Sequence, residues 1–360
     1  MSEPPLPSKR RGRLFRFGAA SVVLLGVAGY LAVQYESGGG SGPGCRVVSG
    51  KGDGATYEFT PEQAVNAATI TAVGTARELP ERAVTIALAT ALQESALRNI
   101  DYGDRDSLGL FQQRPSQGWG TPEEIMDPVY SAEKFYEGLE KVPGYTRLPL
   151  TVAAQRVQLS GFPQAYAKHE PDATLLAAAL TGHSAATLTC TGRPGTTRAA
   201  GTDAVRAALA RDFGGGTLEP AGAEVSDTAD SSAPSPAPSA PPSSFSTPAA
   251  PAAPLADAGV DSDGRTVTLS VRADADAGRK AGAQGWQLAH WAVANASELH
   301  IERVAYAGRE WTAGSAGNRW RVLENETDGK TDGKNSGKNG GKNTEAVGDG
   351  AGEVRITTAQ

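Results

Sequence analysis

Residues 80–97 read Pro-Glu-Arg-Ala-Val-Thr-Ile-Ala-Leu-Ala-Thr-Ala-Leu-Gln-Glu-Ser-Ala-Leu. Small and apolar residues occupy nearly every side of a helix drawn through this stretch, and that pattern is typical of a helix buried in a core. We therefore expect a helix that starts at Pro80 and runs through Leu97. It would form the centre of a mainly α-helical domain. One acidic residue, Glu94, lies inside its second half.

The surroundings of Glu94 favour an unusual carboxyl group. Helical spacing places it over Ala87, Thr90 and Ala91. Burial among such groups disfavours the charged form and raises the pKa of a carboxyl. A carboxyl that stays protonated near neutral pH suits a general acid in glycoside cleavage. The alternative is a Glu that emerges into solvent as the helix ends near Arg98, and periodicity does not choose between the two.

The segment that follows carries a second motif. Glu94-Ser95 is followed by Ser-Leu-Gly-Leu-Phe-Gln-Gln-Arg-Pro at residues 107–115. This resembles the soluble-type lytic transglycosylases and the goose-type lysozymes. Those proteins have Glu-Ser at the end of a buried helix, then Gly-Leu-Met-Gln and a nearby proline. Phe111 stands at the Met position here, and the likeness continues weakly through Asp127-Pro128 to a helix that ends near Leu139.

The resemblance implies a lysozyme-like domain over residues 45–213 that cleaves the glycan strands of peptidoglycan without a metal or another cofactor. Glu94 would be the catalytic acid and protonate the glycosidic oxygen. The same group, once ionised, would help the sugar's own hydroxyl to close an anhydro ring. We assign the following residues to substrate binding: Ser95, Gln112, Gln113, Trp119 and Tyr166.

The family's third motif, Ala-Tyr-Asn-Ala-Gly, is absent from its expected place. Residues 152–166 read Val-Ala-Ala-Gln-Arg-Val-Gln-Leu-Ser-Gly-Phe-Pro-Gln-Ala-Tyr instead. Gln155, Gln158 or Tyr166 would have to replace the missing Tyr and Asn. The loss supports a rival function, in which a catalytically inactive lysozyme-like domain binds the cell wall or serves as a scaffold.

Two further sets of residues near the motif have two interpretations each. A hydrolase places water with a second acid, and Asp101, Asp104 and Asp106 lie in the loop after Glu94; a solvated acidic turn is the other interpretation. Trp119 follows the motif on an expected loop. It would either stack on a sugar face or belong to the core.

The first residues indicate export. Residues 1–16 are basic, residues 17–35 form an apolar stretch long enough for a thin bilayer, and residues 36–44 are a Gly/Ser spacer. We expect a single-pass anchor with a cytoplasmic N-terminus, and the bulk of the chain outside the cytoplasmic membrane. A cleaved signal peptide has the same charged start and apolar middle, and it would also export the protein.

Cys45 and Cys190 are the only cysteines. In an exported chain two such thiols usually form a disulfide, and the alternative is two unrelated buried thiols. The formal net charge of −6 argues against a nucleic-acid partner, because such proteins usually carry a basic patch. The four histidines show no metal-ligand spacing.

The second half of the chain is expected to hold a Pro/Ala/Ser-rich disordered linker at 214–256 and a small α/β domain at 257–324. Residues 325–350 are a Gly/Lys/Asn-rich low-complexity segment, either a solvated loop or a contact for anionic wall polymers. Residues 351–360 would form a terminal strand. The small domain has no evident ligand and would contact a partner protein. Its expected elements are strands at 266–272, 301–306 and 319–323 and a helix at 277–299, and its tryptophans 286, 291, 311 and 320 would form either its core or a sugar-binding platform.

Overall fold

A computed structural model describes residues 44–159, 163–192, 201–214, 218–220, 256–261, 264–271, 281–314, 319–323 and 352–359. Within it, Pro43–Gln360 form one compact unit. The expected anchor at 17–35 and the low-complexity segment at 325–350 lie outside the described residues. Among the helices that are described, none is both long and apolar enough to cross a bilayer.

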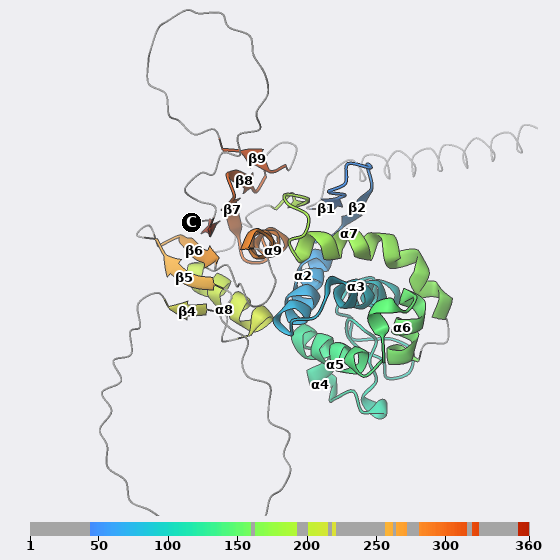
Figure 1. Cartoon of the computed structure of the whole chain (residues 1–360). Coiled ribbons are helices and arrows are strands. Elements are labelled where there is room, and N and C mark those ends of the chain that lie inside the picture. Colours follow the sequence, from blue (N-terminus) through green and yellow to red (C-terminus); the bar gives the residue numbers. More distant parts are fainter. Residues whose placement is uncertain are drawn as a thin grey trace, which may run out of the picture. The chain divides into compact units, whose positions relative to one another are not determined.

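The first part of the unit is helical, as expected (Figure 1). Short 3₁₀ turns interrupt it at Pro115–Gln117, Tyr145–Arg147 and Pro163–His169, the last of which is labelled η3. Its helices are α2 (Pro61–Ala76), α3 (Glu81–Ser95), α4 (Pro122–Ile125), α5 (Pro128–Glu140), α6 (Leu150–Gln158), α7 (Glu170–Leu180) and α8 (Gly201–Phe213).

Two of these helices begin at reciprocal capping pairs. The Thr60 side chain accepts a hydrogen bond from the Gln63 backbone, and the Gln63 side chain reaches back to the Thr60 backbone. Thr121 and Glu124 form the same reciprocal pair at α4. Each pair satisfies backbone N–H groups that the first turn of a helix leaves without partners, and this is how the sequence fixes the start of the helix.

Helix α3 is buried along most of its length and is the central helix of the region, as expected. It ends two residues earlier than the expected end at Leu97. Ala96 and Leu97 both have positive φ values, 54° and 58°. This left-handed pair reverses the chain and tucks Leu97 into the core, where it is fully buried. Leu97 is therefore buried by the turn after α3 and not, as its helical spacing predicted, by the helix itself.

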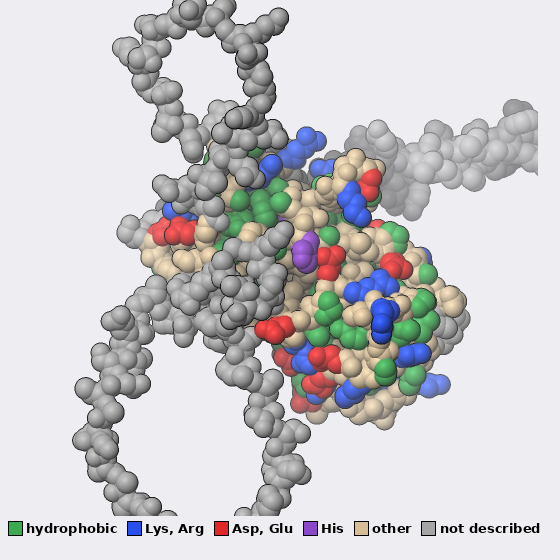
Figure 2. Space-filling model, in the orientation of Figure 1, with side chains coloured by type: hydrophobic (Ala, Val, Ile, Leu, Met, Phe, Trp, Pro, Cys, Tyr) green, Lys and Arg blue, Asp and Glu red, His purple; other side chains and the backbone are tan. Residues whose placement is uncertain are grey.

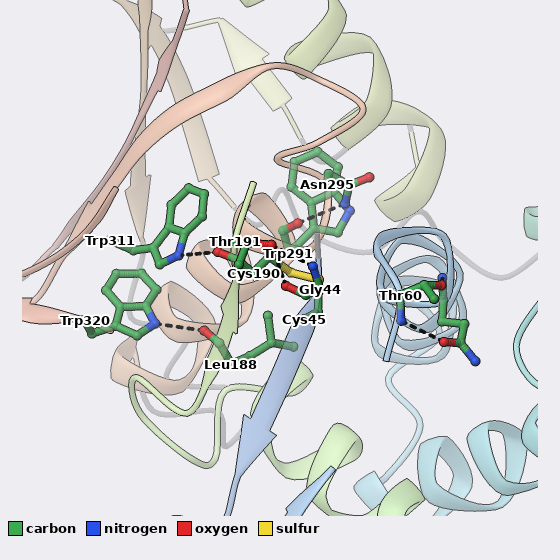
Figure 3. The surroundings of a disulfide bond; sticks show 11 residues. Gly44, Cys45, Thr60, Leu188, Cys190, Thr191, Trp291, Asn295, Trp311 and Trp320 are labelled. Carbon is green, nitrogen blue, oxygen red and sulfur yellow. Dashed lines mark hydrogen bonds between the residues drawn. A yellow bond between two sulfur atoms is a disulfide. The ribbon is translucent and has the colours of Figure 1, made fainter. Parts of the chain in front are cut away.

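A small sheet of order β2-β1-β3 covers one side of the helical region. Its strands are β1 (Cys45–Val48), β2 (Thr56–Phe59) and β3 (Leu188–Cys190). Cys45 and Cys190 are direct partners in the antiparallel β1–β3 pair, and they form the expected disulfide. Figure 3 shows the indole N–H groups of Trp311 and Trp320 aimed at the backbone of β3, where they donate to the Cys190 and Leu188 carbonyls.

The second part is a mainly antiparallel sheet of order β4-β5-β6-β10-β7-β8-β9 with helix α9 (Ala281–Ala294) beside it (Figure 1). The expected strands at 266–272 and 301–306 are present, and that at 319–323 is shortened to two residues. The expected helix at 277–299 already ends at Ala294, and its first residues lie outside the described ones. The strands are β4 (Leu218–Pro220), β5 (Ala256–Val260), β6 (Thr266–Val271), β7 (Ile301–Tyr306), β8 (Arg309–Thr312), β9 (Arg321–Val322) and β10 (Glu353–Thr358).

Strand β4 lies inside the stretch expected to be a disordered linker. Leu218 to Pro220 pair in parallel with Ala256 to Ala258 of β5. The expectation failed here because the strand is held by backbone pairing with a distant segment, which composition does not reveal. The other described residues of the expected linker are Gly214 and Ala256.

Helix α9 joins the two parts through buried polar contacts. Gln287 donates to the Thr75 hydroxyl of α2 at 2.6 Å, and Trp291 donates to the Asp212 carboxylate of α8 at 2.8 Å. Gly182, with φ of 79°, lies so close to α9 that a Cβ atom there would collide with the Ala283 carbonyl. The two parts therefore share one core.

The four tryptophans of the second part belong to this core. Trp291 and Trp311 are at most 1% exposed, and Trp286 and Trp320 are at most 8% exposed. Trp286 packs edge-on against both Trp320 and Tyr306. A sugar-binding platform needs exposed ring faces, so the core interpretation is the right one.

Candidate active site around Glu94

Glu94 lies one residue before the end of α3, and its side chain is partly buried. Its closest partner is Tyr166, whose hydroxyl donates to Glu94 Oε1 at 2.5 Å. Tyr166 itself is fully buried in η3, 72 residues further along the chain. The fold therefore brings together two residues that the sequence separates widely.

Burial raises the pKa of Glu94 above its ordinary value. Hydrogen bonds from Tyr166 and Gln158 act in the opposite direction, because they stabilise the ionised carboxylate, but burial has the larger effect. The carboxyl group thus combines a raised pKa with partners that hold it in place. A raised pKa favours the protonated form relative to an ordinary carboxyl, and this is the direction that a general acid needs.

The end of α3 is tied to the Gly109–Gln112 segment. The buried Ser95 hydroxyl donates to the Leu110 carbonyl at 2.8 Å and also bonds the carbonyl one turn back in its own helix. Ser95 thus fixes the motif segment beside Glu94. This buried position makes it a positioning residue and not a substrate contact.

Residues 108–113 form a tight hairpin, closed by a bridge between Leu108 and Gln113. Inside it, Phe111 is fully buried and stacks on Phe135 of α5, with ring centroids 4.7 Å apart. Gly109 has a φ of 75° and packs so closely on the Ile125 carbonyl that a side chain would clash. The glycine and the aromatic residue of the motif therefore anchor the hairpin in the core.

The two glutamines of the motif have different surroundings. Gln112 is partly exposed, and its amide donates to the carbonyls of Tyr102 and Gly109, both at 3.3 Å. Gln113 is 2% exposed and donates to the Ser131 carbonyl of α5. Gln112 is thus open to a ligand, whereas Gln113 holds the hairpin against α5 and does not reach solvent.

The residues named as replacements for the third motif lie on α6 and η3. Tyr166 and Gln158 both bond Glu94, and Gln158 also donates to the Phe111 carbonyl at 2.6 Å. Gln158 therefore touches the acid and the motif hairpin at once. Gln155 lies on α6 and is partly buried.

The acids of the loop after Glu94 do not share one role. Asp106 accepts from the Arg114 side chain at 2.7 Å and from the Ser116 backbone at 2.9 Å. The Ser116 side chain, followed by Arg114 and the Ser116 backbone, holds the pKa of Asp106 well below the ordinary value. Asp101 is exposed. The Asp104 side chain is 92% exposed beside Arg105. Asp106 is thus a structural acid, and the other two are solvated.

Two aromatic residues lie in the loops that flank the motif. Trp119 is partly buried against the core, and its backbone carbonyl accepts from the Tyr130 hydroxyl. Tyr102 is 63% exposed, and its carbonyl bonds Gln112. Tyr102, a large aromatic residue in a polar loop, was not among the residues expected at the site.

The visible face of the helical part carries no dominant charge. In Figure 2, Lys, Arg, Asp and Glu side chains are interspersed over the visible face of the helical part. Among the described residues no group of three His, Cys, Asp or Glu side chains is arranged to hold a metal ion.

Comparison with known proteins finds a relation in the other part of the chain. Residues 252–333 match the VldE C-terminal domain. The matched range contains β5 through β9 and α9 but not Glu94 or the motif hairpin. No curated protein matches the chain. The likeness of the helical part to lytic transglycosylases thus rests on residues 94–115 and on the contacts made there.

Proposed function

We propose that the helical part is a lysozyme-like domain that cleaves peptidoglycan glycan strands outside the cytoplasmic membrane, with Glu94 as the catalytic acid. The observation that carries the proposal is the surroundings of this one carboxyl. It is partly buried, has a raised pKa and accepts a hydrogen bond from Tyr166 at 2.5 Å. It also lies beside a hairpin that the Ser95–Leu110 bond holds in place.

In the proposed reaction Glu94 protonates the glycosidic oxygen as the bond to the sugar breaks. Tyr166 occupies Oε1, so the proton is carried on Oε2. The ionised Glu94 then removes the proton of the attacking hydroxyl. A sugar hydroxyl gives an anhydro product and water gives an ordinary reducing end. Gln158 and Tyr166 stabilise the carboxylate between the two steps.

The rival proposal is a wall-binding or scaffold protein that has kept the groove without turnover. The replaced third motif favours it. Tyr166 and Gln158 weaken that argument, because they supply a hydroxyl and an amide to the acid from the region where the motif is missing. The disulfide suits an extracytoplasmic location for either function.

The test uses the full chain, because α9 shares a core with the helical part. Purified peptidoglycan is incubated with the wild type, with Glu94→Gln and with Glu62→Gln, a control that removes an exposed acid of α2. Products are identified by mass spectrometry. We expect Glu94→Gln to lower the rate by at least about 100-fold, since positioned acids contribute that much or more, and the control to have no effect.

Three outcomes separate the alternatives. Anhydro products identify a transglycosylase, and ordinary reducing ends identify a hydrolase. Products that persist at the wild-type rate in Glu94→Gln would overturn the assignment of the acid. Absence of products at every pH tested, with the protein still sedimenting with the wall, would overturn cleavage and support the binding function.

A further inference from the structure

A cavity of about 370 Å³ lies where the small N-terminal sheet meets the end of the C-terminal sheet. Its lining includes three arginines from three separate segments: Arg46 of β1, Arg309 at the start of β8 and Arg319 just before β9. Figure 2 shows Lys and Arg side chains gathered where β8 and β9 approach β1 and β2. The site is separate from Glu94, which is not among its lining residues.

Strand geometry explains why Arg46 faces this cavity. Side chains alternate along a strand, and Cys45 and Val47 are buried on the opposite face of β1. Arg46 lies directly opposite Thr189 of β3, so both point to the same face. Thr187, on the same side of the cavity, adds a second hydroxyl. The cavity wall on this side is thus one arginine and two hydroxyl groups on a disulfide-linked strand pair.

The other wall is supplied by the C-terminal part. Arg309 and Val322 are partners in the β8–β9 pair, and that pairing holds Arg319 and Trp320 near the cavity. The Trp320 ring is fixed by its bond to the Leu188 carbonyl at 2.9 Å and by its edge-on contact with Trp286. Trp320, Val48 and Ala186 make part of the lining apolar.

The positive charge of this cavity is not compensated by the described residues. None of the three guanidinium groups forms an ion pair with a described side chain, and the lining contains no Asp or Glu. Glu58 lies opposite Arg46 on β2 but does not form an ion pair with it. Three like charges that converge on one cavity repel each other, and a bound anion relieves that repulsion.

We propose that this cavity binds a small phosphorylated molecule, with the phosphate held by Arg46, Arg309 and Arg319. Arginine presents planar, paired donors that match phosphate oxygens, and the Thr189 hydroxyl adds a further donor. The volume exceeds that of a phosphate group alone and falls in the range of small-ligand sites. The apolar remainder of the lining would contact the organic part.

The test measures ligand binding by the full chain, by titration calorimetry and by the shift of the unfolding midpoint, at constant ionic strength. The first probe is inorganic phosphate, and the second is glucose 6-phosphate beside glucose. We expect saturable binding of phosphate with a dissociation constant of about 1 mM or tighter. We expect glucose 6-phosphate to bind at least as tightly, and glucose not to bind.

The variants Arg309→Gln and Arg319→Gln change exposed side chains and should leave the fold intact. Each should weaken phosphate binding by about tenfold, because each removes a charge-assisted contact. The matched control is Arg321→Gln, which removes an exposed arginine of β9 outside the cavity lining and should change binding by less than about twofold. Arg46→Gln is tested third, with its unfolding midpoint as a check on folding.

Several outcomes would overturn the proposal. One is the absence of saturable phosphate binding up to about 10 mM, far above the affinity expected. Another is an equal loss of binding in Arg321→Gln and Arg319→Gln, which would indicate general surface charge. Equal binding of glucose and glucose 6-phosphate would show that the arginines do not bind the phosphate group. Citrate binding without phosphate binding would show that the cavity binds carboxylates and not phosphates.

Discussion

The molecule holds buried carboxylates in two different ways. At the seam between α8, α2 and α9, the Asp212 side chain is fully buried and accepts from Trp291 at 2.8 Å, from Arg211 at 2.8 Å and from Thr69 at 3.2 Å. At the end of α3, Glu94 is only partly buried, and its partners are Tyr166 and Gln158.

The difference separates a structural acid from a candidate catalytic one. Asp212 has donors from three elements, one of them a permanent positive charge, so its oxygens are fully used in joining the parts of the fold. Glu94 has neutral donors and access to solvent, so it can exchange a proton and meet a ligand.

The largest expected effect comes from removing the acid of the seam. Asp212→Ala leaves the buried indole N–H of Trp291 and the buried Thr69 hydroxyl without their acceptor, and the half-exposed Arg211 loses its ion-pair partner. We expect a loss of about 3 to 5 kcal/mol in the free energy of unfolding, because each buried donor that is left without an acceptor costs about 1 to 3 kcal/mol. Denaturant unfolding of the full chain measures it.

The control for this change is Asp203→Ala, which removes an exposed acid in the first turn of the same helix. We expect it to cost less than about 1 kcal/mol, mostly through the helix dipole. Similar losses for the two variants would show that Asp212 does not organise the seam.

A second effect concerns the pH dependence of stability and His290, a buried residue of α9. Its Nδ1–H donates to the Ala179 carbonyl at 2.8 Å, and its Nε2 accepts from the Thr187 backbone at 3.2 Å, so the ring is neutral. Burial lowers the pKa of His290 to about 4. In the folded state His290 therefore takes up its proton at a lower pH than in the unfolded chain, where the histidine titrates at the ordinary value.

The neutral His290 contributes full stability above the ordinary histidine pKa of 6.5, and that contribution is lost as pH falls from there to about 4. The loss should amount to roughly 3 kcal/mol. His290→Gln, which keeps one donor and one acceptor, should flatten this part of the stability–pH curve. An unchanged slope in His290→Gln would contradict the assignment.

The smallest effect probes the acid of the candidate site. Tyr166→Phe removes the hydroxyl that stabilises the Glu94 carboxylate, so the pKa of Glu94 should rise further. A carboxyl titration by NMR measures it without reference to turnover. If Glu94 acts as an acid, the fall of activity toward high pH should move to higher pH as well. Tyr102→Phe removes an exposed hydroxyl and serves as the control; a lowered pKa in Tyr166→Phe would contradict the geometry.

Local signals in the sequence predicted much of the fold. The capping boxes at Thr60 and Thr121 fix helix starts because every group involved lies within four residues. The core role of α3 follows from its own composition. The disulfide followed from there being only two cysteines in a chain expected to be exported.

What the sequence did not predict depends on contacts between distant segments. Leu97 is buried by a left-handed turn and not by helical periodicity. Strand β4 exists because β5 pairs with it across the chain. The contacts of Tyr166 and Gln158 with Glu94 depend on how α6 and η3 fold back onto α3, which no residue pattern in the segment 152–166 specifies.

The Cys45–Cys190 bond has a mechanical consequence. It joins the first described strand to β3 at the point where the two strands are direct partners. A pull on the chain ahead of Cys45 is therefore transmitted through a covalent bond into the middle of the fold, and β1 cannot be peeled from β3 one hydrogen bond at a time. Under tension the first element to yield must lie outside this pair, so reduction of the bond should lower the force at which the molecule opens.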